Sequence, residues 1–168
     1  VTIIGILIAV VGGGGGAVFE NMKKAQAKND MTSVSIAIKA FYNDYSRYPI
    51  PANKTDDAPY EPSKSADGNK EVMNILTAAN AELNTKGIRY YEGKTVKDPA
   101  APKAGLSDGG LFDPWGYTYG IVVDGDNDTK LKYEGSQIKD LTDAEKVIPG
   151  GVGVFSLGTK QTSPIRSW

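Results

Sequence analysis

The chain has 168 residues and a formal net charge of −1, and it contains neither histidine nor cysteine. Its near-neutral charge gives no reason to expect a nucleic-acid partner. The missing residue types exclude disulfide frameworks, thiol chemistry, Cys/His zinc sites and every pairing of a nucleophile with histidine. We expect one globular domain, for which a chain of this length has room, in addition to an apolar leader.

Residues 1–19 form an apolar segment, because no charged residue occurs before Glu20. At a helical rise of about 1.5 Å per residue this segment would span about 28 Å, close to the hydrocarbon thickness of a bilayer. We expect it to lie in a membrane, inside a polymer of identical chains, or in each in turn. The residues expected to form a filament core are Ile3, Ile4, Ile6, Leu7, Ile8, Val10 and Val11.

Consecutive glycines complicate the apolar segment: Gly12, Gly13, Gly14, Gly15 and Gly16. Each costs about 1 kcal/mol relative to alanine in a helix interior. We therefore expect a joint between two helical rods, which extends or melts outside lipid. A flexible linker behind a membrane anchor is the alternative. A signal peptide is not favoured, because no basic residues precede the apolar run.

Residues 20–48 are expected to form the amphipathic half of the same helical spine. Apolar residues recur there at spacings of four, three, four, three and four residues, and no proline occurs before Pro49. That spacing is typical of one helix face, which we expect to pack on the chain's own globular part. The residues of this face are Ala27, Met31, Val34, Ile38, Phe41 and Tyr45.

Residues 49–168 are expected to form the globular C-terminal part. Proline and polar residues predict two long loops, 50–69 and 93–110, and helical spacing returns over 70–83, with Asn69 as a cap and Gly87 as a stop. Alternating apolar residues predict strands over 117–123, around Leu131 and Tyr133, and over 152–157. We expect an antiparallel meander covered by the long helix, and hence an α+β fold.

Three motifs follow one another along the chain. The helix is expected to end in Phe41-Tyr42-Asn43-Asp44-Tyr45-Ser46-Arg47-Tyr48-Pro49, Asp113-Pro114-Trp115-Gly116 has the preferences of a type I turn, and Phe155-Ser156-Leu157-Gly158 ends the last predicted strand. Together with the apolar leader, this combination resembles the type IV pilin-like superfamily. It is most similar to the major pseudopilins of type II secretion and related bacterial filaments. The motif residues taken as structural are Arg47, Tyr48, Pro49, Asp113, Pro114, Trp115, Gly116, Phe155, Leu157 and Gly158.

The resemblance implies a structural subunit with no cofactor, and a long helical spine packed on a small sheet. Members of the family are held in the bacterial inner membrane by the apolar helix and are processed by a prepilin peptidase. An assembly machinery then draws them into a helical filament of identical subunits, either extracellular or periplasmic. A membrane-anchored surface binding module is the alternative function, and an enzyme built on paired carboxylates is the weakest one.

The chain departs from the family at its start. The family begins with phenylalanine and carries glutamate at its fifth position, whereas this chain has Val1 and Gly5, and its first acid is Glu20. Alignment of the apolar runs leads us to expect that roughly nine residues are missing from the start. The alternative is a subunit without the family glutamate, which pairs with the N-terminal amine of a neighbour.

A candidate metal site is formed by Asp124, Asp126 and Asp128, which offer carboxylates at alternate positions as calcium loops do. The EF-hand pattern is not met, because Thr129 and Gly135 stand where glycine and glutamate are required. A polar turn without a metal and a calcium loop therefore both stay open. Major pseudopilins often bind calcium after the Phe-Ser-Leu-Gly strand, but residues 159–166 contain no acid, so that site is not transferred.

Overall fold

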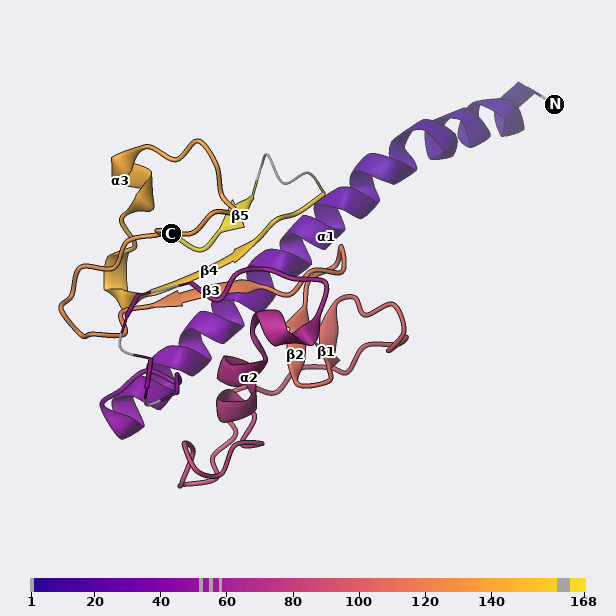
Figure 1. Cartoon of the computed structure of the whole chain (residues 1–168). Coiled ribbons are helices and arrows are strands. Elements are labelled where there is room, and N and C mark those ends of the chain that lie inside the picture. Colours follow the sequence, from indigo (N-terminus) through magenta and orange to yellow (C-terminus); the bar gives the residue numbers. More distant parts are fainter. Residues whose placement is uncertain (1, 52, 55, 58, 160–163) are drawn as a thin grey trace.

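The computed structural model describes residues 2–51, 53–54, 56–57, 59–159 and 164–168, with side-chain surroundings given from Gly16 onward. The protein has an α+β fold in which one long N-terminal helix, α1 (Thr2–Tyr45), lies along a small antiparallel sheet (Figure 1). This coarse architecture confirms the fold class predicted from the sequence.

The predicted filament-core side chains, Ile3 to Val11, and the joint glycines Gly12 to Gly15 lie outside the residues whose surroundings are described. Gly16 belongs to α1 and is exposed. The roles of the core segment and of the joint therefore stay predictions. Within the part of the chain that is described, no helix combines the length and the apolar character needed to cross a membrane.

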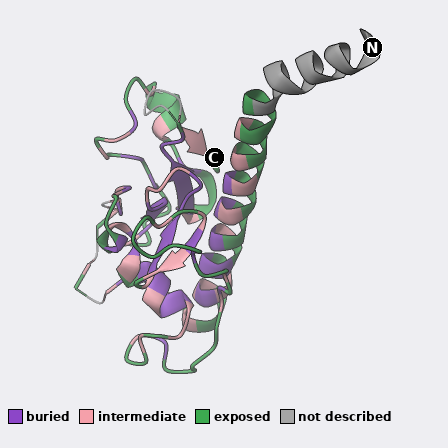
Figure 2. Ribbon diagram, turned by 90° about the vertical axis from the view of Figure 1, so that its right-hand side faces the viewer, coloured by how far each residue is buried: buried purple, intermediate pink, exposed green. Residues whose placement is uncertain are grey.

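The inner face of α1 packs on the globular part as its spacing predicted. Ala27, Met31, Val34, Ile38 and Phe41 are all buried, and they share one core with both the sheet and helix α2. Figure 2 shows the buried residues on the side of α1 that faces the globular part and the exposed residues on the opposite side. An apolar stripe of this kind stabilises a helix chiefly through the surface that it buries.

The main sheet has the strand order β3–β4–β5, with both pairings antiparallel. Strand β3 (Gly120–Val123) pairs with β4 (Val152–Ser156), which places Ile121 opposite Val154, and β4 also pairs with the short β5 (Ile165–Arg166). One face of this sheet packs on α1 and α2, and the other face carries a second apolar cluster. Because both faces are covered, β3 and β4 are buried along their whole length.

The predicted return strand around Leu131 and Tyr133 is wrong. Both residues are buried, but they lie in the segment that covers the outer face of β3 and β4, where Tyr133 packs edge-on against Phe155. Only an isolated bridge joins Lys132 to Val147. Alternation shows that one side of a segment is buried, but it does not show whether that segment extends a sheet or covers it. Helices α3 (Asp143–Lys146) and η2 (Pro149–Gly151) complete this covering segment.

The predicted loop 93–110 is also wrong in its second half, which forms a hairpin. Strands β1 (Gly105–Ser107) and β2 (Gly110–Phe112) are antiparallel, with Ser107 opposite Gly110. The two residues between them, Asp108 and Gly109, have φ angles of 46° and 80°. Positive φ at both central positions is the requirement of the tight hairpin turn that Asp-Gly favours.

Helix α2 (Lys70–Leu76) is shorter than the predicted helix 70–83 and follows the short helix η1 (Ala66–Gly68). The chain turns away at Ala78, whose φ is 60°, and the Asn84 side chain donates to the Ile75 carbonyl. Asn69 precedes α2 but does not cap it with its side chain. Instead, that buried amide hydrogen-bonds the backbone of Leu111 and Tyr119. The predicted stop at Gly87 therefore lies beyond the end of the helix.

Candidate functional site

The turn motif and the last-strand motif meet through one buried carboxylate. Asp113 Oδ1 accepts hydrogen bonds from the backbone N–H groups of Trp115, Gly116 and Tyr117, at 2.8–3.0 Å. The Ser156 hydroxyl donates to Asp113 Oδ2 at 2.6 Å and accepts from the Gly158 N–H at 3.1 Å. Burial raises the pKa of Asp113, although these hydrogen bonds oppose the effect. Sequence positions far apart thus form one unit, in which Pro114, Phe155, Leu157 and Gly158 are also buried.

The same unit is joined to α1 through Glu20. Its Oε2 accepts from the Trp115 indole N–H at 3.2 Å and from the Thr159 hydroxyl at 2.9 Å, and Lys23 Nζ lies 3.2 Å from Oε1. Donation by Thr159, followed by Lys23 and Trp115, lowers the pKa of Glu20. We call this set of contacts the Glu20 junction; it comprises Glu20, Lys23, Asp113, Trp115, Ser156 and Thr159. The sequence motifs contained all its members except Glu20, Lys23 and Thr159, and no local pattern points to those three.

The helix-end motif fixes the chain where α1 stops. Arg47 donates to the Leu83 carbonyl at 2.6 Å, and its guanidinium lies 5.6 Å from the Phe41 ring centroid. The Tyr48 ring packs 4.6 Å from that of Tyr42, and Pro49 is buried. Burial and the nearby Asp124 raise the pKa of Tyr48 to about 12. These contacts fix the end of α1 against the chain at Leu83.

The candidate metal residues do come together, and a fourth acid joins them. Ligand oxygens of Asp57, Asp124, Asp126 and Asp128 all lie within 4.8 Å of one another. The backbone N–H groups of this turn already bind the carboxylates, as in Thr129 N–H to Asp124 at 3.0 Å and Gly125 N–H to Asp57 at 2.8 Å. Burial, and then the neighbouring acids, raise the pKa of Asp57. The geometry suits either a hydrogen-bonded turn or a site for a hard cation, so calcium binding stays a prediction.

The outer face of α1 is exposed and uncharged. The outer face is the side of α1 opposite the core, from Val18 to Ile36, and its residues follow one another at spacings of four, three, four, three and four. Its large side chains are mostly exposed: Val18 at 57%, Met22 at 61% and Ile36 at 63%. A solvent-facing helix side normally carries charged and polar residues. The outer face consists of Val18, Met22, Ala25, Asn29, Thr32 and Ile36.

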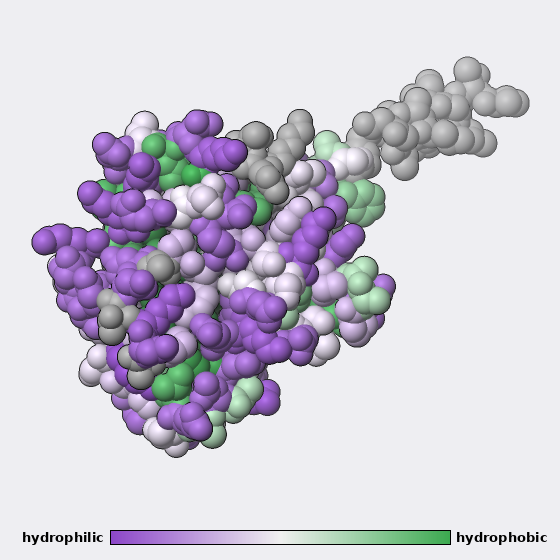
Figure 3. Space-filling view, in the orientation of Figure 1, coloured by the Kyte–Doolittle hydropathy of each residue, from purple (hydrophilic) through white to green (hydrophobic). Residues whose placement is uncertain are grey.

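The hydropathy of the surface agrees with this description. On the side shown in Figure 3, hydrophilic residues dominate the globular part, while hydrophobic residues appear close to the place where α1 leaves it. Phe19, which is 65% exposed, belongs to this region and lies beside the outer face. Spacing in the sequence could have found this second stripe, since it has the same four-and-three rhythm as the buried one.

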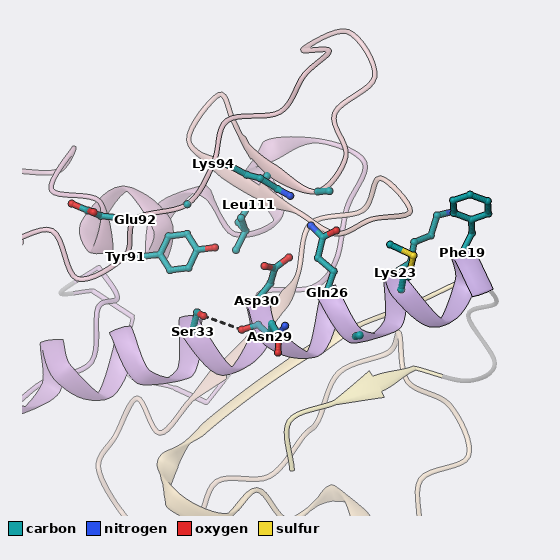
Figure 4. Close-up of a pocket in the computed structure, with 15 residues that line it drawn as sticks. Phe19, Lys23, Gln26, Asn29, Asp30, Ser33, Tyr91, Glu92, Lys94 and Leu111 are labelled. Atoms are coloured by element: carbon teal, nitrogen blue, oxygen red, sulfur yellow. Dashed lines mark hydrogen bonds between the residues drawn. The ribbon is translucent and has the colours of Figure 1, made fainter. Parts of the chain in front are cut away.

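A groove of about 770 Å³ runs beside the outer face, between α1 and the chain around Tyr91–Lys94 and Leu111 (Figure 4). Phe19 and Met22 line one end of it. The Asp30 carboxylate points into the groove (Figure 4). It accepts a hydrogen bond from the Tyr119 hydroxyl at 2.9 Å. Burial raises the pKa of Asp30, against the opposing effects of Tyr119 and Lys94. Ser33 is not activated by a base, because its hydroxyl donates to the Asn29 carbonyl.

The groove therefore offers apolar contact area, hydrogen-bonding groups and charges of both signs, which suit binding. Comparisons of the chain with protein-family models, with curated proteins and with solved structures found no match. The function must accordingly be argued from the sequence motifs and from the surfaces just described.

Proposed function

We propose that the protein is a structural subunit of a pilin-like filament, either a type IV pilus or a type II secretion pseudopilus, and that it polymerises through its N-terminal helix. The observation that carries this proposal is the outer face of α1, which is exposed and uncharged over five helical turns and continues the apolar segment 1–19. A helix with a buried apolar stripe on one side and an exposed, uncharged and largely apolar side opposite it has one partner within its own chain and offers a second surface to another partner.

Burial of the apolar side chains on and beside the outer face would contribute more free energy than an exposed ion pair does. Complete burial of a large apolar side chain contributes about 1.5–3 kcal/mol. Val18, Phe19, Met22 and Ile36 are each between 57% and 65% exposed. Burying what remains of them would therefore contribute about 4–7 kcal/mol per chain, whereas an exposed ion pair contributes about 0–1 kcal/mol. Residues 1–11 would add their own apolar surface to this sum.

The motif contacts also support a pilin-like subunit. The turn motif and the last-strand motif, on which the resemblance rests, are bonded to each other and to α1. In the proposed assembly pathway, the subunit is first held in the bacterial inner membrane and processed by a prepilin peptidase. It is then assembled with identical copies into an extracellular or periplasmic filament.

Electron microscopy of sheared or secreted material tests the proposal. We expect uniform thin fibres from the wild type and none from Met22→Asp, because a charge on the outer face would be buried at the contact between subunits. Ile6→Asp tests the apolar segment in the same way. Val147→Asp is the matched control, since Val147 is 48% exposed and lies far along the chain from α1. Normal fibres from Met22→Asp would refute polymerisation through this face.

The alternative, a membrane-anchored binding module, is favoured by one observation, the groove beside Asp30. That function predicts single chains in detergent and no fibres under any condition. The same micrographs therefore separate the two functions.

A further inference from the structure

Glu20 occupies a particular place along α1. Ala27 is the first residue of the described part of α1 that is fully buried. Glu20 precedes it by seven residues, which is about 10 Å along the helix. Its immediate neighbours, Phe19 and Asn21, are exposed. This part of α1 therefore extends beyond the packed core, and a contact made there acts at a distance from it.

The hydrogen bonds of Glu20 reach the globular part from this extended position. Among the described residues, the side-chain hydrogen bonds that connect 16–26 to the rest of the chain both end on Glu20 Oε2. Their donors come from two separate segments, Trp115 in the turn motif and Thr159 after β4. A carboxylate oxygen that is bound by donors from two separate segments is restrained more than one bound by a single donor.

Both donors are themselves held in place. The Trp115 backbone N–H is bound to Asp113, and Asp113 is bound to Ser156. Ser156 in turn accepts from the N–H of Gly158, the residue before Thr159. The contacts thus form a closed ring that runs from α1 through both motifs and back to α1. A restraint at Glu20 is therefore anchored in the buried core of the sheet.

We infer that Glu20 is a positioning residue, which fixes the direction in which α1 leaves the globular part by binding Trp115 and Thr159. Without these bonds, the part of α1 before Ala27 would keep only its contacts along the groove, and its direction would be less restrained. The hydrogen bonds from Thr159, Lys23 and Trp115 lower the pKa of Glu20 and so favour its carboxylate form.

The consequence for assembly rests on the proposed function. A tilt of about 10° at Ala27 would displace a helix position 25 residues away by about 7 Å, at 1.5 Å per residue. Packed helices lie about 8–10 Å apart, so this displacement is enough to lose a packing contact. A subunit whose helix direction varies would then enter the filament less often or with altered symmetry.

The inference is tested first on the single chain, without any filament. The full-length protein has no cysteine, so spin labels can be placed at Gly16→Cys and Ser136→Cys, which are both exposed positions. Double electron–electron resonance in detergent then measures the distance between them. We expect a narrow distribution in the wild type, and a broader, shifted one after Glu20→Ala. Thr159→Val, which removes one donor while keeping the side-chain shape, should also broaden it.

Lys23→Ala is the matched control, because Lys23 contacts Glu20 from within α1 and does not join the helix to the globular part. It should leave the distribution narrow. If Glu20→Ala and Thr159→Val both keep the wild-type mean and width, the inference is overturned. The filament is the second readout: Glu20→Ala fibres should be fewer or differ in helical symmetry. If the wild type forms no fibres, the proposed function fails, while the resonance measurement still decides the role of Glu20.

Discussion

The buried bond between Ser156 and Asp113 gives the sharpest prediction for stability. Ser156→Ala removes the donor to Asp113 Oδ2 and the acceptor for the Gly158 N–H, and both Ser156 and Asp113 are buried. A hydrogen bond to a charged group contributes about 1.5–3 kcal/mol and a neutral one about 0.5–1.5 kcal/mol. We therefore expect Ser156→Ala to lower the free energy of unfolding by about 3 kcal/mol. For a chain of this size that corresponds to a Tm lower by about 6–12 °C.

The loss should depend on pH in a defined direction. Burial already raises the pKa of Asp113, and the Ser156 hydroxyl opposes this by stabilising the carboxylate. Without the hydroxyl, the pKa of Asp113 rises further. The cost of Ser156→Ala should therefore be largest where Asp113 is a carboxylate, and it should shrink as pH falls through the pKa of Asp113 and the group becomes neutral.

Urea unfolding followed by tryptophan fluorescence, at pH 7 and at pH 4, measures both effects on the full-length chain in mild detergent. Ser136→Ala is the control, since Ser136 is exposed and only its backbone N–H is bonded, to Glu61. If Ser156→Ala is no more destabilising than Ser136→Ala, the buried bond does not have the role assigned to it. A loss that is equal at both pH values would contradict the charged state of Asp113.

Two further carboxylates, Asp30 and Asp57, have raised pKa values, and replacing either by a neutral side chain should change the stability of the chain. Asp30→Asn keeps an acceptor for Tyr119 but removes the half-buried charge. It should therefore raise the free energy of unfolding at pH 7. This gain should vanish in acid, where Asp30 of the wild type is itself protonated. A gain that persists unchanged at pH 3 would contradict this explanation. Asp57→Asn relieves repulsion between the half-buried Asp57 and the three neighbouring acids. In a chelating buffer it should therefore stabilise the chain, by about 0.2–1 kcal/mol if the effect is as large as that of a surface charge pair. If Asp57→Asn has the same Tm as the wild type, the neighbouring acids do not destabilise the chain by repulsion. If these acids bind calcium, the added ion should stabilise the wild type more than Asp57→Asn.

The sequence was sufficient to predict the elements whose patterns are local and long. The buried face of α1 follows from the spacing between Ala27 and Phe41, since only a helix places all these residues on one side. The turn at Asp113 was predicted as well, because Asp, Pro and Gly each have their own positional preference in it. Its backbone N–H groups do bind the Asp113 side chain.

Sequence patterns were insufficient where long-range pairing decides the structure. Leu131 and Tyr133 alternate as a strand would, yet β4 occupies the position beside β3, and these residues cover the sheet instead. Asp57 is distant in sequence from Asp124, so the fourth acid of the cluster could not be found by spacing. The hairpin at Asp108 is a different kind of error, because its Asp-Gly signal is local and was overlooked.

The charges on α1 distinguish a filament helix from an ordinary surface helix better than its apolar content does. A surface helix of a monomer keeps charged residues opposite its core, since that side faces water. In α1 the exposed lysines Lys28 and Lys39 lie beside the outer face, and no charged residue lies on it between Val18 and Ile36. Charges at the edge of a contact remain hydrated when helices associate, whereas a charge at its centre would be desolvated at a cost of several kcal/mol. The distribution of charges on α1 therefore allows another apolar surface to pack on the outer face. Met22→Asp places a charge at the centre of that contact, and so tests whether the contact forms.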